Sequence, residues 1–387
     1  MKTIFKNGIM LLAVLMMAVP FTSCDDDDES EVQNNDELYK SILNEYVNTT
    51  IIPTYKALAE AALDMRTAND ALKSNPSDAT MKAASDAWMK ARVWWEINEA
   101  FLFGPVGEDA LDIDGHIDSW PLELNEIKTS IEGEGGNITG REAWKLDAEV
   151  IGFHVTEYLL YRDGKSRPVN DLTGGELKYL IAATDALVWD CVLAYVAWVG
   201  EENVSSTIKT VFNENPDVVA HLNANPNYKN FADRLKNARG YSSFGAALSE
   251  ISSGAADIAG EVGATKIESP YLNGKTEDVE SWYSWHSLDD YQNNIQSIKN
   301  AYLGGIDNNT RTSVSLSTYV ALKNANLDRE IKAKIEDCIT KIAAIGQGGK
   351  SFYEVVRDRI NGTQVSAAVD ACAELEDLFG SLEDIIE

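Results

Sequence analysis

Cysteine, histidine and positive charge are all scarce in this chain of 387 residues. There are four cysteines and four histidines, and 33 lysines and arginines stand against 62 acidic residues, for a formal charge of −29. Because nucleic-acid binding needs basic patches that neutralise phosphates, the sequence predicts no nucleic-acid partner. An acidic surface keeps a protein soluble and also favours cations at long range.

The cysteines are too few to form a disulfide framework. Beyond Cys24 only Cys191, Cys338 and Cys372 remain, and each lies on the apolar stripe of an expected helix. We expect buried thiols, with a Cys338–Cys372 bridge as the alternative in an exported protein. Their spacing does not indicate a zinc site.

Motifs of the common hydrolases and nucleotide-binding proteins are missing as well. The sequence contains no His-Glu-x-x-His, no Gly-x-Ser-x-Gly, no P-loop and no Gly-x-Gly-x-x-Gly. These absences exclude the usual zinc-peptidase helix, the serine nucleophile elbow and the glycine-rich phosphate loops. The residues therefore give poor support to a peptidase of a common kind.

The first 24 residues have the pattern of a lipoprotein signal peptide. Lys2 and Lys6 precede an uncharged apolar run, residues 9–19, which is too short for a comfortable membrane span. Small residues then lead to Cys24, which we expect to carry the lipid that anchors the chain to a membrane. An ordinary signal peptide with an incidental cysteine is the alternative. No later run is expected to span a membrane.

Residues 25–35 are polar and acidic, and we expect them to form a solvated tether. The acidic run 25–29 also resembles the export tags of Bacteroidetes lipoproteins. The expected location is the cell envelope, as an outer-membrane lipoprotein. Periplasmic and surface-exposed placements both remain open.

Apolar residues recur with helical period through the rest of the chain, whereas the alternation typical of strands is nearly absent. An all-α fold is therefore expected. The predicted helices are 36–73 (bent near Pro53), 78–103, 141–162, 173–200, 227–239, 244–267, 278–303, 328–344 and 365–385. Thr173 and Glu176 predict a capping box. The broken segment 201–226 suggests two helical bundles, residues 36–202 and 203–387.

His154 and Glu157 are the strongest local candidates for chemistry. They are three residues apart, so both side chains point to one face of a helix. An imidazole and a carboxylate on one face form a common pair of metal ligands. The alternative is a core histidine that is hydrogen-bonded to a neighbouring glutamate.

A second group of donors lies in the loop 108–118. It comprises Asp109, Asp112, Asp114, His116 and Asp118. The loop lacks the glutamate at the twelfth position of an EF-hand, which excludes that calcium site. A solvated acidic loop is the favoured interpretation.

Several segments together resemble the imelysin family of envelope proteins. Gly152-x-His154-x-x-Glu157 matches the Gly-x-His-x-x-Glu motif of imelysin-like proteins. The other segments follow in the family's order: 88–105, with Glu99-Ala100-Phe101 and Gly104-Pro105; 113–121, ending in Trp120-Pro121; 261–271; and 279–304. His286 departs from this branch, in which we expect Asn; the imidazole could tune a site or face solvent.

The resemblance covers residues 36–386 and implies two four-helix-bundle-like domains packed side by side, with the matched segments meeting in a cleft. It implies metal ligands at His154, Glu157, Glu99 and Asp118. The residues expected to line a ligand cleft are Gly152, Arg92, Glu96, Trp120, Pro121, Glu280, Ser281, Ser284 and Ser287.

Three functions follow from these observations. The first is a role in iron or haem uptake, in which the protein binds iron, another divalent metal or an iron-carrying ligand and works with an uptake transporter or receptor. The second is a metallopeptidase in which His154 holds a metal and Glu157 acts as ligand or general base. The third is an interaction scaffold whose polar cluster only fixes the packing of the bundles.

Overall fold

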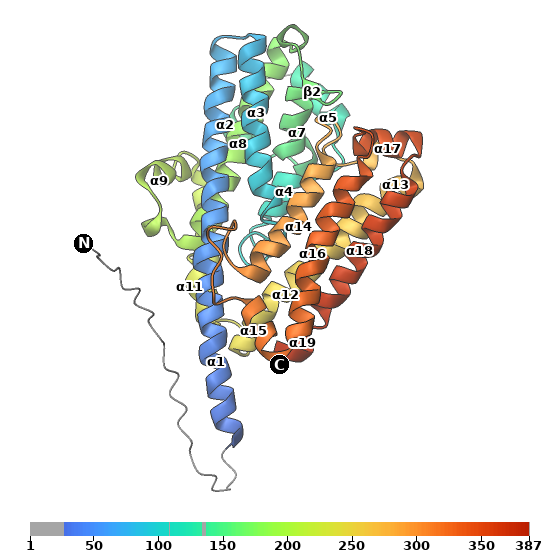
Figure 1. Ribbon diagram of the computed structural model, residues 1–387. Helices are drawn as coiled ribbons and strands as arrows, with labels where there is room; N and C mark the ends of the chain where they lie inside the picture. The colour runs from blue at the N-terminus through green and yellow to red at the C-terminus, as the bar shows by residue number, and fades with distance from the viewer. Residues whose placement is uncertain (1–26, 108, 134–136, 387) are drawn as a thin grey trace, which may run out of the picture.

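The structure, a computed structural model, describes residues 27–107, 109–133 and 137–386 of the chain (Figure 1). It is almost entirely helical, which confirms the all-α prediction. The strands in the described part form one short hairpin, β1 (Tyr161–Arg162) with β2 (Lys165–Ser166). Cys24 and the predicted signal peptide lie outside the described residues.

The first bundle is built on four long helices, α1 (Asp27–Tyr46), α2 (Ile52–Ser74), α3 (Asp78–Glu96) and α8 (Gly174–Val199), and on the shorter α7 (Gly152–Leu160). α2 packs against α3 and α8, and α7 packs against both α3 and α8. α1 begins inside the segment expected to be a tether. A π-helical turn, η1 (Val47–Ile51), joins α1 to α2, where Pro53 occupies a first-turn position that needs no backbone N–H.

α8 is the core helix of this bundle. Thr173 and Glu176 form its predicted capping box, with Thr173 Oγ1 accepting from the Glu176 amide. By length and composition alone, this helix is long and apolar enough to cross a membrane. The expectation that no run after the signal peptide would be apolar enough was therefore wrong. Since 89% of its most apolar window is buried inside the protein, the apolar run is explained by the core.

The predicted helix 141–162 is wrong, because the chain breaks twice within it. α6 (Gly140–Ala143) and a 3-10 turn, η3 (Ala148–Val150), precede α7. Ile151 is extended and Gly152 has a φ of +81°, so a helix cannot run through them. The loop before it holds two further helices, α4 (Ile113–Asp118) and α5 (Leu124–Gly133).

Short helices fill the segment after α8, as the scattered Asn and Pro residues predicted. They are η5 (Glu201–Asn203), α9 (Ser206–Phe212), α10 (Pro216–Ala224), η6 (Pro226–Tyr228) and α11 (Phe231–Lys236). α9, α10 and α11 pack against α8. These residues are therefore added to the flank of the first bundle, where α9 projects to one side (Figure 1).

Four helices make up the second bundle: α12 (Phe244–Gly260), α14 (Ser287–Leu303), α16 (Ala325–Ile345) and α18 (Gly362–Gly380). Each packs against two of the others in a closed ring. Smaller elements cover its ends, namely the π-helix η7 (Glu261–Glu268), α13 (Ser269–Asn273), η8 (Thr276–Asp278), α15 (Leu316–Lys323), α17 (Phe352–Asp358) and α19 (Glu383–Ile386).

Two sequence expectations are decided in this bundle. Cys338 on α16 and Cys372 on α18 are buried and free, as is Cys191, so the buried-thiol prediction is confirmed and the bridge is absent. The predicted helix 278–303 begins only at Ser287. The chain before it turns through Ser281 and Trp285, which both have positive φ.

The bundles lie side by side (Figure 1) and meet along α3, α12, α14 and a 3-10 turn, η2 (Glu99–Phe101). η2 enters the space between α12 and α14. Gly254 of α12 makes this approach possible, because a Cβ at that position would lie 2.4 Å from the Ala100 carbonyl oxygen. The close contact places Glu99 at the junction of the two bundles.

Candidate functional site

Arg92 lies at the centre of a buried group of charges between the bundles. Its side chain, on α3, is fully buried. The guanidinium contacts Glu96 one turn away and Asp118 at the end of α4. From the second bundle it reaches Glu280 at 2.9 Å and Asp290 at 3.4 Å. One cation thus joins carboxylates from four segments of the chain.

His154 lies beside this group with both ring nitrogens facing carboxylates. Nδ1 is 3.2 Å from Oε2 of Glu157, which confirms that the two side chains share one face of α7. Nε2 is 3.1 Å from Oδ1 of Asp118 and 3.5 Å from Oε1 of Glu280. Nε2 is buried and makes no well-directed hydrogen bond with the described residues, so these two contacts are ion pairs. The Trp120 ring covers the imidazole edge-on at 4.8 Å.

The lack of a side chain at Gly152 allows α7 and α4 to approach each other closely. A Cβ at this position would lie 2.2 Å from the backbone oxygen of Ile117. The positive φ also favours glycine. Since Ile117 directly precedes Asp118, the close approach sets the Asp118 carboxylate against His154.

A layer of polar groups orients the carboxylates from behind. The amide and hydroxyl of Ser284 both donate to Oε1 of Glu157, at 2.8 and 2.7 Å. Ser281 Oγ donates to Asp290, and Ser287 Oγ donates to the Glu280 backbone carbonyl, each at 2.5 Å. The three serines expected in the ligand cleft are therefore buried supports, whose hydroxyls point at other residues of the protein.

Carboxylates of the first bundle are held in the same way. Trp95 Nε1 donates to Oδ2 of Asp118 at 2.8 Å, and Asn294 Nδ2 donates to Oε2 of Glu96 at 2.6 Å. Fixing both oxygens of a carboxylate removes its rotational freedom. The cluster is consequently pre-organised before any ligand arrives.

The carboxylates of the cluster outnumber its cations. As a result, the pKa is raised at some of these carboxylates and lowered at others. Burial raises the pKa of Glu96 well above its usual range and that of Asp290 to about 6, although Arg92 opposes both shifts. Burial would also raise the pKa of Asp118, but Arg92 and His154 hold it below its usual value. Lys266, His154 and Arg92 overcome burial at Glu280 and keep its pKa low.

The surroundings of His154 favour its imidazolium form. Burial and the nearby Arg92 would lower its pKa, yet the carboxylates of Asp118, Glu157 and Glu280 raise it well above the ordinary value. A proton on Nε2 would face the same two carboxylate oxygens that a metal ion bound to Nε2 would contact. A metal ion there would replace that proton.

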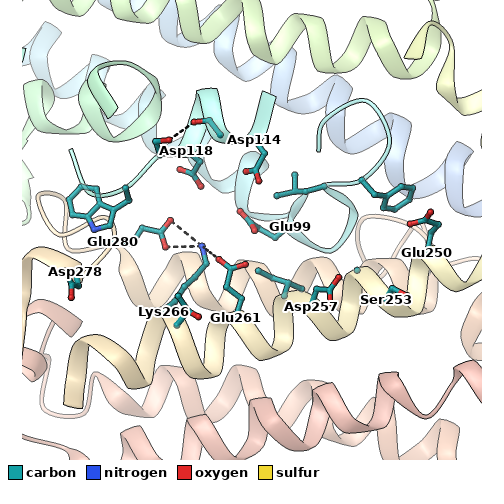
Figure 2. Close-up of a pocket in the computed structure, with 18 residues that line it drawn as sticks. Glu99, Asp114, Asp118, Glu250, Ser253, Asp257, Glu261, Lys266, Asp278 and Glu280 are labelled. Atoms are coloured by element: carbon teal, nitrogen blue, oxygen red, sulfur yellow. Dashed lines mark hydrogen bonds and ion pairs between the residues drawn. The ribbon is translucent and has the colours of Figure 1, made fainter. Parts of the chain in front are cut away.

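A cleft of about 460 Å³ opens on one side of the cluster (Figure 2). η2 and α4 form one wall, and α12 with η7 forms the other. Acidic side chains dominate the lining: Glu99, Asp114, Asp118, Glu250, Asp257, Glu261, Asp278 and Glu280. Lys266 is the single basic residue of that lining, and its Nζ lies 3.0 Å from Glu280 and 3.4 Å from Glu261.

Two overlapping groups in this region bring together three side chains of the kinds that bind metal ions. Asp118, His154 and Glu280 each offer one ligand atom within 4.8 Å of the others, and so do Glu96, Glu99 and Asp118. Two carboxylate oxygens and one imidazole nitrogen suit a divalent transition metal. The buried Nε2 without a directed hydrogen bond fits such an ion.

The predicted site residues divide into three groups. Glu99, Asp118, Trp120 and Glu280 line the cleft. Buried behind it are Arg92, Glu96, Gly152, His154, Glu157, Ser281, Ser284 and Ser287. Pro121 is exposed and does not line the cleft, and His286 pairs with Asp289 at 3.0 Å on the outer surface.

The solvated-loop interpretation is correct for Asp109 and Asp112, which are exposed, and wrong for Asp118, because α4 turns that carboxylate towards Arg92. Sequence reasoning missed Asp290 and Lys266. Both lie in segments that carried the family resemblance, but no local spacing links them to His154. Asp114 was noted as a donor, and burial raises its pKa to about 7.

The two-bundle helical fold and its buried His-x-x-Glu cluster define the class of protein. The sequence model of the imelysin family matches residues 51–381, so the chain belongs to that family. Iron-regulated protein A of Synechococcus elongatus is 25% identical over 259 residues, which are 67% of this chain and 63% of that protein. The match thus spans less than two thirds of that relative's length.

Solved structures agree with this assignment. A protein from Parabacteroides distasonis, described as an iron-regulated protein A precursor, is 28% identical and superposes with a TM-score of 0.76 over 91% of this chain and 96% of that one. An imelysin-like protein from Psychrobacter arcticum superposes with a TM-score of 0.61 over 89% and 94% of the two chains. At 15% identity, the second likeness concerns the fold alone.

Proposed function

We propose that this protein is an iron-related protein of the cell envelope that binds a divalent metal ion between its bundles, with iron as the first candidate. Two lines of support meet here. The chain belongs to the imelysin family, and two of its relatives are named iron-regulated protein A. The cluster around His154 would supply the ligands.

His154, Asp118 and Glu280 would hold the ion. The observation that carries this proposal is His154 Nε2, which is buried, faces two carboxylate oxygens and makes no directed hydrogen bond with the described residues. A bound ion would act there as a Lewis acid and as a cargo or structural centre. Glu99 and Glu96 would supply further oxygens on the cleft side.

Glu157 would orient the histidine in this arrangement. One of its oxygens contacts Nδ1 of His154, and the other accepts two hydrogen bonds from Ser284. A carboxylate that holds the second nitrogen of a metal-binding histidine is a common supporting group. The same contacts occupy Glu157 and so give little support to the peptidase alternative, in which it would act as general base.

A metal ion fits the cleft better than haem does. The lining is mainly carboxylate, and haem carries its own carboxylates together with a broad apolar ring. Lipid attachment at Cys24, an outer-membrane location and a partner iron-uptake transporter or receptor complete this proposal. They extend it beyond the described residues.

A scaffold is the second candidate, and Arg92 favours it. The guanidinium already contacts Oδ1 of Asp118 and Oε1 of Glu280, the same atoms that face His154. A closed cluster of this kind would join the bundles without any ligand.

Calorimetric titration of the purified chain with Fe²⁺ under anaerobic conditions, and with Mn²⁺ and Zn²⁺, separates the two candidates. Stoichiometric binding that is lost in Glu280→Gln and His154→Asn supports the metal site. His286→Asn is the matched control, because it removes an imidazole from the outer surface. If all four proteins bind metal alike, or none does, the cluster is structural.

A further inference from the structure

We propose that the acidic cleft binds an aliphatic oligoamine, a small molecule whose ammonium groups are separated by short hydrocarbon links. This inference goes beyond the proposed metal site, because it rests mainly on residues of α12 and η7 that do not contact His154, although the two sites share Glu99 and Glu280. Glu250, Asp257 and Glu261 follow one another along this wall of the cleft (Figure 2).

The spacing of these carboxylates is too wide for one metal ion. Eleven positions separate Glu250 from Glu261, which is about 16 Å at ~1.5 Å per residue. Oxygens that share one ion must all lie within about 2.6 Å of it, as they do in calcium sites. A ligand that meets the whole row has to carry several positive charges along an extended chain.

Glu99 on the opposite wall, which would also supply an oxygen to the proposed metal ion, is a second indication that the cleft holds a cation. Only 8% of the residue is exposed, and its side chain points into the cleft (Figure 2). No hydrogen bond or ion pair joins its carboxylate to another described residue. Carboxylates of Glu96 and Asp118 offer oxygens within 4.8 Å of it. Burial raises the pKa of Glu99 well above its usual range, Lys266 opposes that shift, and Glu96 adds to it, so a further positive charge in the cleft would stabilise the ionised carboxylate.

Lys266 shows which kind of cation the cleft accepts. Its alkylammonium group is seated between Glu261 and Glu280. Leu102, Phe103 and Ile258 line the same cleft and offer apolar contact to methylene groups. The volume of about 460 Å³ is that of a small-molecule pocket, which favours a free oligoamine over a folded partner.

Titration calorimetry with spermidine at fixed ionic strength tests this proposal. The wild-type protein should bind it saturably. The triple variant Glu250→Gln, Asp257→Asn, Glu261→Gln should bind roughly tenfold more weakly, because three ion pairs are removed. The matched control is Glu330→Gln, Asp370→Asn, Asp377→Asn, which removes the same formal charge from exposed positions on α16 and α18 and should bind like the wild type.

A second variant keeps every carboxylate in place. Ser253 lines the cleft on α12, so Ser253→Lys would put a tethered ammonium among the acids and should also weaken spermidine binding. The proposal is overturned if both triple variants bind spermidine alike, or if Mg²⁺ at the same concentration of positive charge displaces spermidine from the wild-type protein. The variant His154→Asn should still bind spermidine, so this result and that of the metal titration are separable.

Discussion

His154 and Asp118 lie on different helices, yet Nε2 of the imidazole is 3.1 Å from Oδ1 of the carboxylate. The same Asp118 also contacts Arg92 of α3, which in turn reaches Glu280 and Asp290 of the second bundle. The histidine of the family motif is thereby connected to the junction of the bundles. A substitution at His154 should therefore affect the junction of the bundles, and a substitution at the junction should affect His154.

Replacing Arg92 should destabilise the protein severely. Arg92→Met keeps a side chain of similar length and leaves several buried carboxylates without their cation. A loss of about 3–5 kcal/mol is expected, as for other broken buried ion pairs. Denaturant unfolding followed by circular dichroism measures it. Lys82→Met, which breaks an exposed pair with Asp86, should change little; comparable losses for the two variants would contradict the central role of Arg92.

Substitution of Gly152 should separate α7 from α4. Gly152→Ala places a Cβ against the Ile117 carbonyl and strains a residue of positive φ, at a cost of about 1–3 kcal/mol from the backbone alone. Metal binding should weaken with stability. Gly174→Ala, in open space at the first turn of α8, is the control and should leave the protein equally or slightly more stable. Thermal unfolding of both variants, with a titration of each, decides the matter.

Glu157→Gln should distinguish a supporting carboxylate from a ligand. As a support for Nδ1, its loss should weaken metal binding by about 10–100-fold without abolishing it. Glu280→Gln removes an expected ligand and should abolish stoichiometric binding. Titration calorimetry of the two variants side by side gives the comparison. Equal loss in both would mean that Glu157 binds the ion directly.

The titration of Asp114 should make the free energy of unfolding depend on pH. Burial raises its pKa from 3.8 to about 7, so between these values the folded protein keeps a proton that the unfolded chain has released. Stability should therefore fall as the pH rises from about 4 to about 7, and this contribution should level off above.

Thermal unfolding at a series of pH values measures that slope. Asp114→Asn should flatten it, whereas Asp109→Asn, at an exposed position earlier in the chain, should leave it in place. A slope that is unchanged in Asp114→Asn would show that other buried carboxylates, such as Glu99, dominate the titration.

Local patterns predicted the parts of this structure that depend on nearby residues. The 3.6-residue period identified the long helices, and the three-residue spacing placed His154 and Glu157 on one face. The partners of Arg92 could not be predicted in that way. Asp118 lies 26 positions away, Glu280 188 and Asp290 198, and no local period links residues so far apart.

The failed helix prediction over 141–162 has a related cause. Its residues are good helix formers, but the approach of Gly152 to Ile117 imposes a backbone turn that only the tertiary contact requires. The same contact brings the expected solvated loop into the core at Asp118. Tertiary packing therefore explains both wrong predictions, the continuous helix over 141–162 and the solvated position of Asp118.

The free thiols described above have a practical consequence. Cys191, Cys338 and Cys372 are buried and unbridged, so the described fold needs no covalent cross-link to reach its stability. An oxidant is then unnecessary for maturation, and the chain can be produced in the reducing cytoplasm of an expression host in the same state. Metal titrations can likewise be run with a reductant present, which keeps iron ferrous without damage to the protein.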